Sequence, residues 1–500
     1  MSAMQGTPDP LFPASNDGLP HRIHFLGAGG AGVSGAARVL HQRGHALSGH
    51  DRSPGQHVEL LRGLGVHVEI CPQESARLPQ GVEMVVRSAA IALGDPQLRE
   101  ASERNIPVLK YAELLGRITP AGRTLAVAGT HGKTTSSWLA YHACHGAAQA
   151  HALGLPGAII GGICGRIGAN SVVQEPSGLF VVEACEYDRS FLNLVPYGAL
   201  ITNVEDDHLD YFGSSEAIHQ AFSDFAKKVH PEGLLVIGEK VPCGIPSAAR
   251  CEVWRFGSEL LVDLLDEQQG RFVMRLRGPG FVVDQVRIGV PGEFNVENAA
   301  LALGLVIGSC ARVFGLAPES LAAAAGMGLQ NFAGANRRFE SWGNPKGIEL
   351  VHDYAHHPTE VRVTLDTARS VFPGRPLHVL FQPHQHSRTA RFLDAFVESL
   401  RAADRVVIAD VYGARTHIDG EQLATAGDIV SGLARMDISA TAPGDKWASA
   451  RAFAAGLPDN AVGLILGAGD IDEIKHELLA QLACAALPRV LSADEAPTRV

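Results

Sequence analysis

The sequence predicts an α/β protein of three domains: an N-terminal Rossmann-like domain, a central parallel-sheet domain built on a phosphate loop (P-loop), and a C-terminal Rossmann-like domain. With 46% apolar content, the 500 residues are too many for one core, and about three domains of ordinary size are expected. Apolar strands run into glycine-rich loops near residues 27 and 129. Elsewhere apolar strands alternate with helical segments, which is typical of parallel sheets covered by helices.

Breaks in composition divide the chain. Pro/Gly-containing stretches near residues 119–122 and 332–335 mark the domain boundaries, and polar ends rich in Pro, Ser and Asp are expected to be flexible. The expected segments are a flexible N-terminus (1–20), a first domain (21–120), a central domain (121–335), a C-terminal domain (336–490) and a flexible tail (491–500).

Composition restricts the function. The net charge of −11, spread without long charge runs, argues against nucleic acid or an anionic membrane as the main partner. Eight cysteines without a Cys-x-x-Cys pair predict neither structural zinc nor a disulfide framework. No apolar run of membrane-spanning length and no signal core is apparent. We expect a soluble cytoplasmic protein, monomeric or homodimeric, without membrane insertion.

A short apolar strand that ends in two glycines and Lys-Thr-Thr predicts a phosphate loop followed by a helix. Gly129 and Gly132 would let backbone N–H groups surround phosphate oxygens, Lys133 would reach the β- and γ-phosphates, and Thr134 would bind Mg²⁺. The strict Walker pattern has a glycine where this chain has Val127. A glycine turn with a solvent-exposed lysine is therefore the alternative interpretation.

A second glycine loop lies near the N-terminus. Gly27, Gly29 and Gly32 follow the strand 21–26 as G-x-G-x-x-G, and Asp51 ends the next strand. This pattern accepts a diphosphate and is typical of dinucleotide-binding folds. An NAD-dependent dehydrogenase is one reading, but it leaves the loop at Lys133 unexplained.

Candidate ligands follow two central strands. A carboxylate at the end of a buried strand is costly unless it is paired or metal-bound, which makes Glu183 the best metal candidate. His208 follows the next strand and is either a ligand or a helix-capping loop residue. Asn295 and Asn298 open an alanine-rich helix, where amides could read an adenine edge or one could cap the helix.

The last third of the chain offers cationic groups and histidines. Arg338 follows a glycine-containing linker and suits a transferring phosphate. Asp353 to His357 form a strand-to-helix loop, because Pro358 fits a first helical turn. Histidines in this segment could indicate zinc, but no tetrahedral set is completed. Arg388, with His384 in the same loop, suits a carboxylate ligand.

The phosphate loop Gly129-Thr-His-Gly-Lys-Thr134 resembles that of the Mur ligases, which join amino acids to the cell-wall precursor. The resemblance extends from about Arg22 to about Leu482. Further similar segments are Arg87-Ser-Ala-Ala-Ile91, Glu183-Ala-Cys-Glu186, Asn203 to His208, Asn295 to Asn298, Arg337-Arg338-Phe339, Asp353 to Glu360, and Phe381-Gln-Pro-His384 to Thr389. The chain departs from the family at Cys185 and Phe294, so no ligand role is carried onto position 185.

The resemblance implies roles for individual residues. ATP would be bound by Gly129, Thr130, His131, Gly132, Lys133, Thr134, Thr135, Asn295, Asn298, Arg338 and Asp353. The UDP-sugar would be bound by Gly27, Gly29, Gly30, Gly32, Asp51 and Ser88. The amino acid would be bound by Tyr354, His357, His384 and Arg388. Thr134, Glu183 and His208 would hold metal, and Lys133, Glu183, His208 and His356 would be catalytic.

The resemblance also implies a reaction. ATP and Mg²⁺ would activate the lactyl carboxylate of UDP-N-acetylmuramate as an acyl phosphate, which L-alanine would attack. The segment from Phe381 to Thr389 is similar to the branch of the family that adds L-alanine. The alternative within the family is the ligation of the tripeptide L-alanyl-γ-D-glutamyl-diaminopimelate to the same nucleotide.

Overall fold

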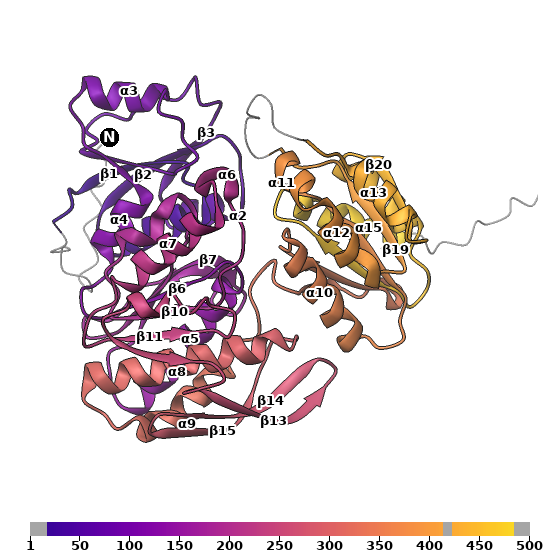
Figure 1. Ribbon diagram of the computed structural model, residues 1–500. Coiled ribbons are helices and arrows are strands. Elements are labelled where there is room, and N and C mark those ends of the chain that lie inside the picture. The colour runs from indigo at the N-terminus through magenta and orange to yellow at the C-terminus, as the bar shows by residue number, and fades with distance from the viewer. Residues whose placement is uncertain (1–17, 414–422, 485–500) are drawn as a thin grey trace, which may run out of the picture. The chain divides into compact units, whose positions relative to one another are not determined.

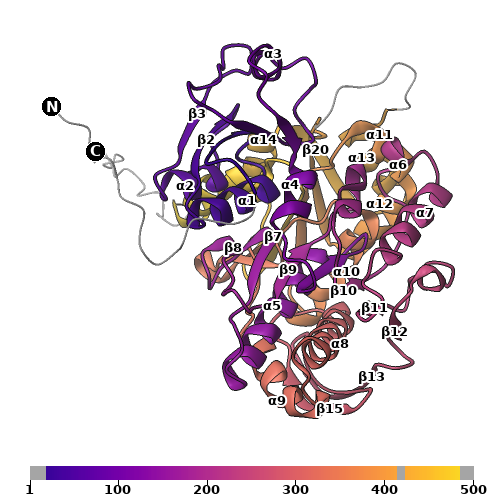
Figure 2. The ribbon, with the colours of Figure 1, turned by 90° about the vertical axis from the view of Figure 1, so that its left-hand side faces the viewer.

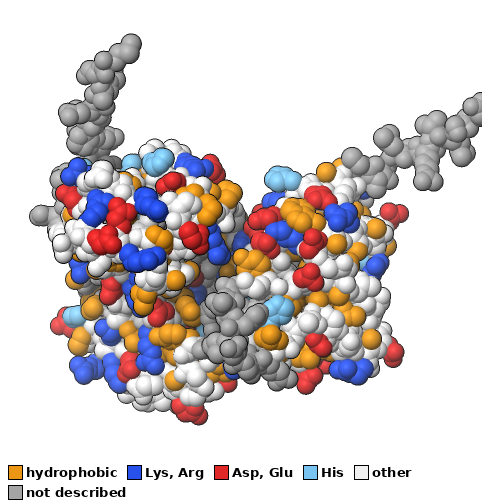
Figure 3. Space-filling model, turned by 90° about the horizontal axis from the view of Figure 1, so that it is seen from above, with side chains coloured by type: hydrophobic (Ala, Val, Ile, Leu, Met, Phe, Trp, Pro, Cys, Tyr) orange, Lys and Arg blue, Asp and Glu red, His pale blue; other side chains and the backbone are white. Residues whose placement is uncertain are grey.

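The computed structural model describes residues 18–413 and 423–484. The chain forms two compact units, Met1–Asn336 and Arg337–Val500, and each is described by itself (Figure 1). The predicted flexible tail at 491–500 and most of the predicted flexible N-terminus at 1–20 lie outside the described residues. On the face drawn in Figure 3, basic and acidic side chains are interspersed on both units.

Unit 1 begins with a five-stranded parallel sheet in the order β3-β2-β1-β4-β5. This is the Rossmann-like order that the glycine loop predicted. Its strands are β1 (Arg22–Leu26), β2 (Ala46–Asp51), β3 (His67–Ile70), β4 (Met84–Arg87) and β5 (Val108–Lys110). Its helices are α1 (Ala31–Gln42), α2 (Gln56–Arg62), α3 (Pro96–Glu103) and α4 (Tyr111–Ile118).

A second sheet of seven strands has the order β12-β11-β10-β6-β9-β7-β8 and is parallel except for the pair β7–β8. Its strands are β6 (Thr124–Ala128), β7 (Gly157–Cys164), β8 (Ala169–Val172), β9 (Phe180–Glu183), β10 (Gly198–Ile201), β11 (Leu234–Ile237) and β12 (Glu252–Arg255). Its helices are α5 (Lys133–Ala150), α6 (Leu209–Phe212), α7 (Ser215–Ala226), α8 (Phe294–Phe314) and α9 (Pro318–Leu329). The helices α5, α8 and α9 pack on one another (Figure 2).

A three-stranded antiparallel sheet was not predicted. It consists of β13 (Leu261–Gln268), β14 (Arg271–Gly278) and β15 (Phe281–Arg287), joined by tight turns. The dipeptides at 269–270 and 279–280, Gln-Gly and Pro-Gly, are the turn signals that could have revealed these hairpins. Gln269 and Gly270 both have a positive φ, as tight hairpin turns require.

The two sheets of unit 1 are tied together by α1. Ile159 of β7 packs against Gly35 of α1, so closely that a Cβ added to this glycine would lie 3.1 Å from the Ile159 side chain. Asn170 of β8 donates a hydrogen bond to the carbonyl of Ala31, the first residue of α1, at 2.5 Å. One hydrophobic cluster contains Phe25 of the first sheet and Phe180 of the second. The segments 21–120 and 121–335 therefore each have a sheet but share one core.

Helix α8 corrects one expectation about membrane-spanning segments. Its 21 residues are long and apolar enough to cross a membrane by composition, with a mean hydropathy of 1.4. An alanine-rich helix beginning near Asn295 was expected, but a helix long and apolar enough to pass this test was not. In the structure 78% of its apolar window is buried, and its residues belong to the largest hydrophobic cluster of unit 1. Burial of this kind is typical of a core helix.

Unit 2 has a six-stranded sheet in the order β16-β17-β21-β18-β19-β20, parallel except for β16. Its strands are β16 (Glu340–Gly343), β17 (Glu349–Asp353), β18 (Leu377–Phe381), β19 (Arg405–Ala409), β20 (Ser439–Gly444) and β21 (Val462–Leu466). Its helices are α10 (Pro358–Val371), α11 (His386–Arg391), α12 (Leu393–Ser399), α13 (Ala426–Ala434), α14 (Lys446–Ala455) and α15 (Lys475–Cys484). The helices α11 and α12 meet at Phe392, so Arg388, expected in a loop, lies in a helix.

Candidate active site

The phosphate loop joins β6 to α5 and has the backbone conformation that its glycines predicted. Gly129 has φ = 136° and Gly132 has φ = 78°, values that L side chains rarely adopt. The helix begins at Lys133, so its free N–H groups face the loop. A residue larger than glycine at 132 would also meet the Asn298 side chain at 2.9 Å.

Lys133 is held inside the loop, so the alternative of a solvent-exposed lysine is wrong. Its side chain is 14% exposed. The ammonium group donates to the carbonyl oxygens of Gly129 at 2.6 Å and Thr130 at 2.9 Å. A carboxylate oxygen of Glu186 lies 2.9 Å away. The cation therefore stands where a nucleotide's phosphates would meet the loop.

Glu186 is the functional residue that the sequence did not single out. Burial raises its carboxyl pKa above the usual range, although the Lys133 charge opposes this. Burial alone would lower the pKa of Lys133, but the Glu186 carboxylate outweighs it and raises that pKa to about 12. In the sequence Glu186 is simply a second acid three residues after Glu183, and its pairing with Lys133 is visible only in the structure.

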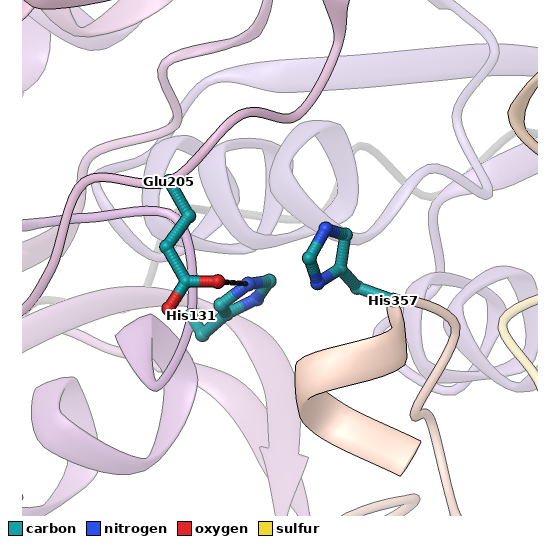
Figure 4. Close-up of side chains that lie close together, drawn as sticks. All are labelled: His131, Glu205 and His357. Carbon is teal, nitrogen blue, oxygen red and sulfur yellow. Dashed lines mark ion pairs between the residues drawn. The ribbon is translucent and has the colours of Figure 1, made fainter. Parts of the chain in front are cut away.

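The segment after β10 lies along the phosphate loop. The Asn203 side chain accepts from the His131 N–H at 2.8 Å and donates to the His131 carbonyl at 3.2 Å. The Thr130 hydroxyl accepts from the Glu205 N–H at 2.9 Å. Glu205 and His131 also form an ion pair, 3.6 Å between Nε2 and Oε2 (Figure 4). These contacts fix the peptide planes of the phosphate loop and hold the imidazole of His131, a residue of the loop, beside Glu205.

Glu183 ends β9 and lies beside Val127, the residue two before the loop's first glycine. Its Oε2 accepts from the Gly161 N–H at 2.8 Å. A Cβ on the next residue, Gly162, would lie 2.8 Å from the Thr134 side chain. Glu183 and Thr134 thus lie against successive residues of β7, Gly161 and Gly162. Carboxylate and hydroxyl oxygens are both ligands of the kind that Mg²⁺ prefers.

His208 occupies the N-cap position of α6, but its side chain does not cap the helix. Its φ is 53° and no side-chain hydrogen bond is made to the helix end. Its Nε2 is 4.0 Å from Glu186 Oε1, and its ring centre is 5.1 Å from that of Tyr187. The helix-capping interpretation is therefore wrong. The histidine belongs to the same cluster as Lys133 and Glu186.

The two asparagines at the start of α8 are buried and are not helix caps. Asn295 donates to the Pro291 carbonyl at 2.7 Å, and Asn298 donates to the Asn295 amide oxygen at 3.0 Å. The N-cap is Glu293, whose side chain makes no capping bond. Asn298 lies against Gly132, so this pair is positioned beside the phosphate loop. The exposed Phe294 takes no part in these contacts.

The N-terminal glycine loop brings together the residues expected to bind the sugar nucleotide. The Gly29 N–H donates to Asp51 Oδ2 at 2.8 Å. A Cβ on Gly27, whose φ is 72°, would meet Ser88 at 3.0 Å. Gly30 is the N-cap of α1, and a Cβ on Gly32 would meet Tyr111. The loop is closely surrounded, and its N–H groups lie at the start of a helix.

In unit 2, Asp353 ends β17 next to the linker. Its carboxylate accepts from the Phe339 N–H at 2.7 Å and the Ala355 N–H at 2.9 Å. Burial raises the pKa of Asp353 to about 6, although the Arg338 charge opposes the shift. Arg338 lies over the Tyr354 ring at 5.1 Å. The aspartate, the arginine and the tyrosine form one cluster at the end of the strand.

The histidines that follow are held by Glu360, not by one another. His356 Nδ1 is 3.1 Å from Glu360 Oε2, which also accepts from the His357 N–H at 3.2 Å. His357 is the N-cap of α10. His352 points elsewhere, because its Nδ1 bonds the Ile465 carbonyl at 3.0 Å and its ring packs on Trp342. The three histidines therefore do not form a zinc site.

His384 and Arg388 lie where β18 ends. The His384 ring is 5.8 Å from that of His356 and stacks 5.6 Å from that of Tyr412. Arg388, in α11, is buried. A guanidinium can recognise a carboxylate with two parallel hydrogen bonds. Unit 2 thus brings His356 and His384 together from segments that are distant in sequence.

Family models match the chain in three consecutive segments. Residues 22–123 match the "Mur ligase family, catalytic domain", residues 127–306 the "Mur ligase middle domain", and residues 337–486 the "Mur ligase, glutamate ligase domain". The described folds of both units agree with this division.

Two relatives are named UDP-N-acetylmuramate–L-alanine ligase. That of Kineococcus radiotolerans is 38% identical over 94% of this chain and 98% of its own length. That of Saccharopolyspora erythraea is 37% identical over 94% and 96%. Among solved structures, the UDP-N-acetylmuramate-alanine ligase of Thermotoga maritima has a similar fold, with a TM-score of 0.74 at 23% identity over 92% and 98% of the chains. A murein peptide ligase of Psychrobacter arcticus has a TM-score of 0.67 at 20% identity over 93% and 99%. The chain belongs to the Mur ligase family.

Proposed function

We propose that this protein joins L-alanine to the lactyl carboxylate of UDP-N-acetylmuramate, with ATP and Mg²⁺, to give ADP, phosphate and UDP-N-acetylmuramoyl-L-alanine. The substrates are those in the names of the relatives that are 37–38% identical over 94% of this chain. The proposal places the enzyme in the cytoplasm, where ATP is available, as a monomer or homodimer.

The observation that carries the proposal is that one strand, β7, connects the two anion loops of unit 1. Ile159 contacts α1, the helix of the N-terminal loop, and Gly161 bonds Glu183 beside the phosphate loop. Two residues along a strand span about 7 Å. A sugar diphosphate on the first loop and a nucleotide on the second would therefore be held in a fixed relation. A ligase that activates one substrate with the other requires this arrangement.

The reaction has two steps. A carboxylate oxygen of the sugar nucleotide attacks the γ-phosphorus of ATP, the bond to the β-phosphate oxygen breaks, and ADP leaves. The amine of L-alanine then attacks the acyl carbon, phosphate leaves, and the amine loses a proton. Lys133 would stabilise the negative charge that shifts onto the leaving oxygens, which is the main way a protein accelerates such a transfer.

The oxygens of Thr134 and Glu183, with His208, would hold Mg²⁺, which supplies further positive charge to the phosphates when bound. In the free protein the Glu186 carboxylate neutralises the charge of Lys133. When ATP binds, a phosphate oxygen would therefore have to replace this carboxylate as the partner of Lys133. Asn295 and Asn298 would contact the adenine. In unit 2, Arg338 and Asp353 would contact the nucleotide, and Arg388 and His384 would hold the amino acid's carboxylate.

Phosphate release from the purified protein tests the proposal. The protein is incubated with ATP, Mg²⁺ and UDP-N-acetylmuramate, and L-alanine, glycine, L-serine or the tripeptide is supplied in parallel. Release that depends on the sugar nucleotide and is fastest with L-alanine supports the proposal. Faster release with the tripeptide L-alanyl-γ-D-glutamyl-diaminopimelate would favour the alternative function, in which the tripeptide is joined to UDP-N-acetylmuramate. Release with no acceptor preference would contradict both.

A further inference from the structure

Tyr111, the first residue of α4, lies against the N-terminal glycine loop. A Cβ on Gly32 would meet Cζ and Oη of Tyr111 at 2.6 Å. Gly32 lies in the first turn of α1, where backbone N–H groups have no partner within the helix and attract anions. The tyrosine hydroxyl therefore stands at the edge of the place where a diphosphate would bind.

The start of α4 is also fixed to the central domain. Lys110 Nζ is 3.0 Å from Asp188 Oδ2, in the segment that follows Glu183. Helix α4 packs on the 3₁₀ helix Tyr187–Asn193 of that same segment. The start of α4, which carries Tyr111, is thus held by α1 and by the segment Tyr187–Asn193. A side chain held in this way loses little freedom when it binds a ligand.

The Tyr111 side chain is half-buried, and within residues 18–413 and 423–484 its hydroxyl has no hydrogen-bond partner. Burial, and after it the Glu183 carboxylate, raise the pKa of Tyr111 above its ordinary value. The group is therefore protonated at neutral pH and can donate. A donor without a partner beside an anion-attracting helix end is suited to a phosphate oxygen.

We propose that the hydroxyl of Tyr111 binds the diphosphate of the sugar nucleotide by donating a hydrogen bond to it. The inference rests on the proposed function for the identity of the sugar nucleotide. It differs from a packing role, because a phenyl ring would fill the space beside Gly32 equally well. Only the oxygen atom distinguishes the two roles, so the replacement that tests it is Tyr111→Phe.

Isothermal titration measures the affinity of wild type and Tyr111→Phe for UDP and for UDP-N-acetylmuramate. A hydrogen bond to a charged acceptor is worth about 1.5–3 kcal/mol, so we expect both affinities to fall about tenfold or more. The KM for ATP should remain within about twofold. Tyr197→Phe is the matched control, because the Tyr197 hydroxyl donates to the Glu232 carbonyl at 3.1 Å, at the far end of the central sheet.

Unchanged affinity of Tyr111→Phe for UDP would overturn the inference, whether or not UDP-N-acetylmuramate is affected. An equal loss in Tyr197→Phe would also overturn it, since the loss would then not be specific to position 111. The UDP titration does not depend on the second substrate. Failure of wild type to release phosphate with L-alanine would therefore contradict the proposed function alone.

Discussion

Lys133 Nζ lies 2.9 Å from a carboxylate oxygen of Glu186, and both side chains are almost fully buried. A buried ion pair is retained at a cost in solvation and is weak evidence for stability. Its position in the phosphate loop instead indicates a functional reason. In the proposed mechanism, the carboxylate would hold the charged lysine in place until phosphate oxygens became its partners.

Lys133→Ala should lower turnover by roughly 10³ or more, because the contact strengthens as charge shifts in phosphoryl transfer. Far-UV circular dichroism should show an intact fold. The control is Lys227→Ala, which removes an exposed lysine that pairs only with Asp224. Turnover of Lys133→Ala within about tenfold of wild type would remove the lysine from the mechanism.

Glu183→Ala should lower turnover by a similar factor and raise the Mg²⁺ concentration needed for half-maximal rate. The reason is that it removes a carboxylate proposed to bind Mg²⁺, a cation that prefers oxygen ligands. A Mg²⁺ titration of the steady-state rate measures this, with Glu216→Ala on the surface of α7 as control. An unchanged Mg²⁺ requirement would mean that Glu183 serves only to accept the Gly161 N–H.

Gly29→Val should raise the KM for UDP-N-acetylmuramate while the KM for ATP stays near normal. A Cβ at this position would meet Asp51 Oδ2 at 2.9 Å and Val58 at 3.0 Å, and the larger side chain would block backbone approach to a diphosphate. Gly244→Val is the control, since a Cβ there meets nothing within 4 Å. Fluorescence detection of NADH binding by wild type, without binding of UDP-sugar, would contradict this reading of the loop.

Local sequence signals predicted much of the fold. Strand β6 and the start of α5 follow from an apolar run, two glycines and a lysine. The antiparallel strands β13 to β15 were not predicted, and the two-residue turns at 269–270 and 279–280 are the local signal for them. Helix α8 was expected as an alanine-rich helix, but its membrane-spanning length and apolar composition were not.

The site was predictable where chemistry is local and not where it depends on long-range packing. Gly29 and Asp51, 22 residues apart, follow a known spacing and do meet. The partner of Lys133 is 53 residues away, and nothing in the sequence distinguishes Glu186 from Glu183 as that partner. The sequence likewise did not indicate a ligand-binding role for Tyr111, because that role depends on its packing against the first turn of α1.

The stability of unit 2 should depend on pH through His352. Burial, and after it the Arg337 charge, lower the pKa of His352 from its ordinary value of 6.5 to about 3. As pH falls below 6.5 the unfolded chain binds the proton first, so stability present above pH 6.5 is lost progressively down to about pH 3. Between pH 7 and pH 5 this loss is about 2 kcal/mol.

Urea unfolding of wild type and His352→Phe at pH 7 and pH 5 isolates this contribution. Asp353 acts in the opposite direction, because its raised pKa of about 6 makes the folded state bind a proton in the same range. The comparison between variants removes that contribution, since both retain Asp353. His352→Phe should be less stable at pH 7, having left the Ile465 carbonyl without its donor, and should lose about 2 kcal/mol less on acidification. Equal pH dependence in both would show that His352 is not buried neutral.

Arg388→Lys tests how the amino acid is held. Arg388 is buried in α11, directly after the loop that ends β18, and a guanidinium can bind a small carboxylate through two parallel hydrogen bonds. Lysine keeps the charge but cannot form that pair. The KM for L-alanine should rise by at least about tenfold, or roughly 1.4 kcal/mol, while the KM for UDP-N-acetylmuramate stays nearly unchanged.

The matched control is Arg391→Lys, one turn along the same helix and exposed to solvent, which should leave both constants unchanged. If Arg388→Lys changed neither constant, the ligase proposal could stand, but the carboxylate of L-alanine would have to be held elsewhere. His384 is then the next residue to replace, because its ring lies 5.8 Å from that of His356. If both constants rose together in Arg388→Lys, the arginine would be maintaining the fold of unit 2 and would not be selecting the amino acid.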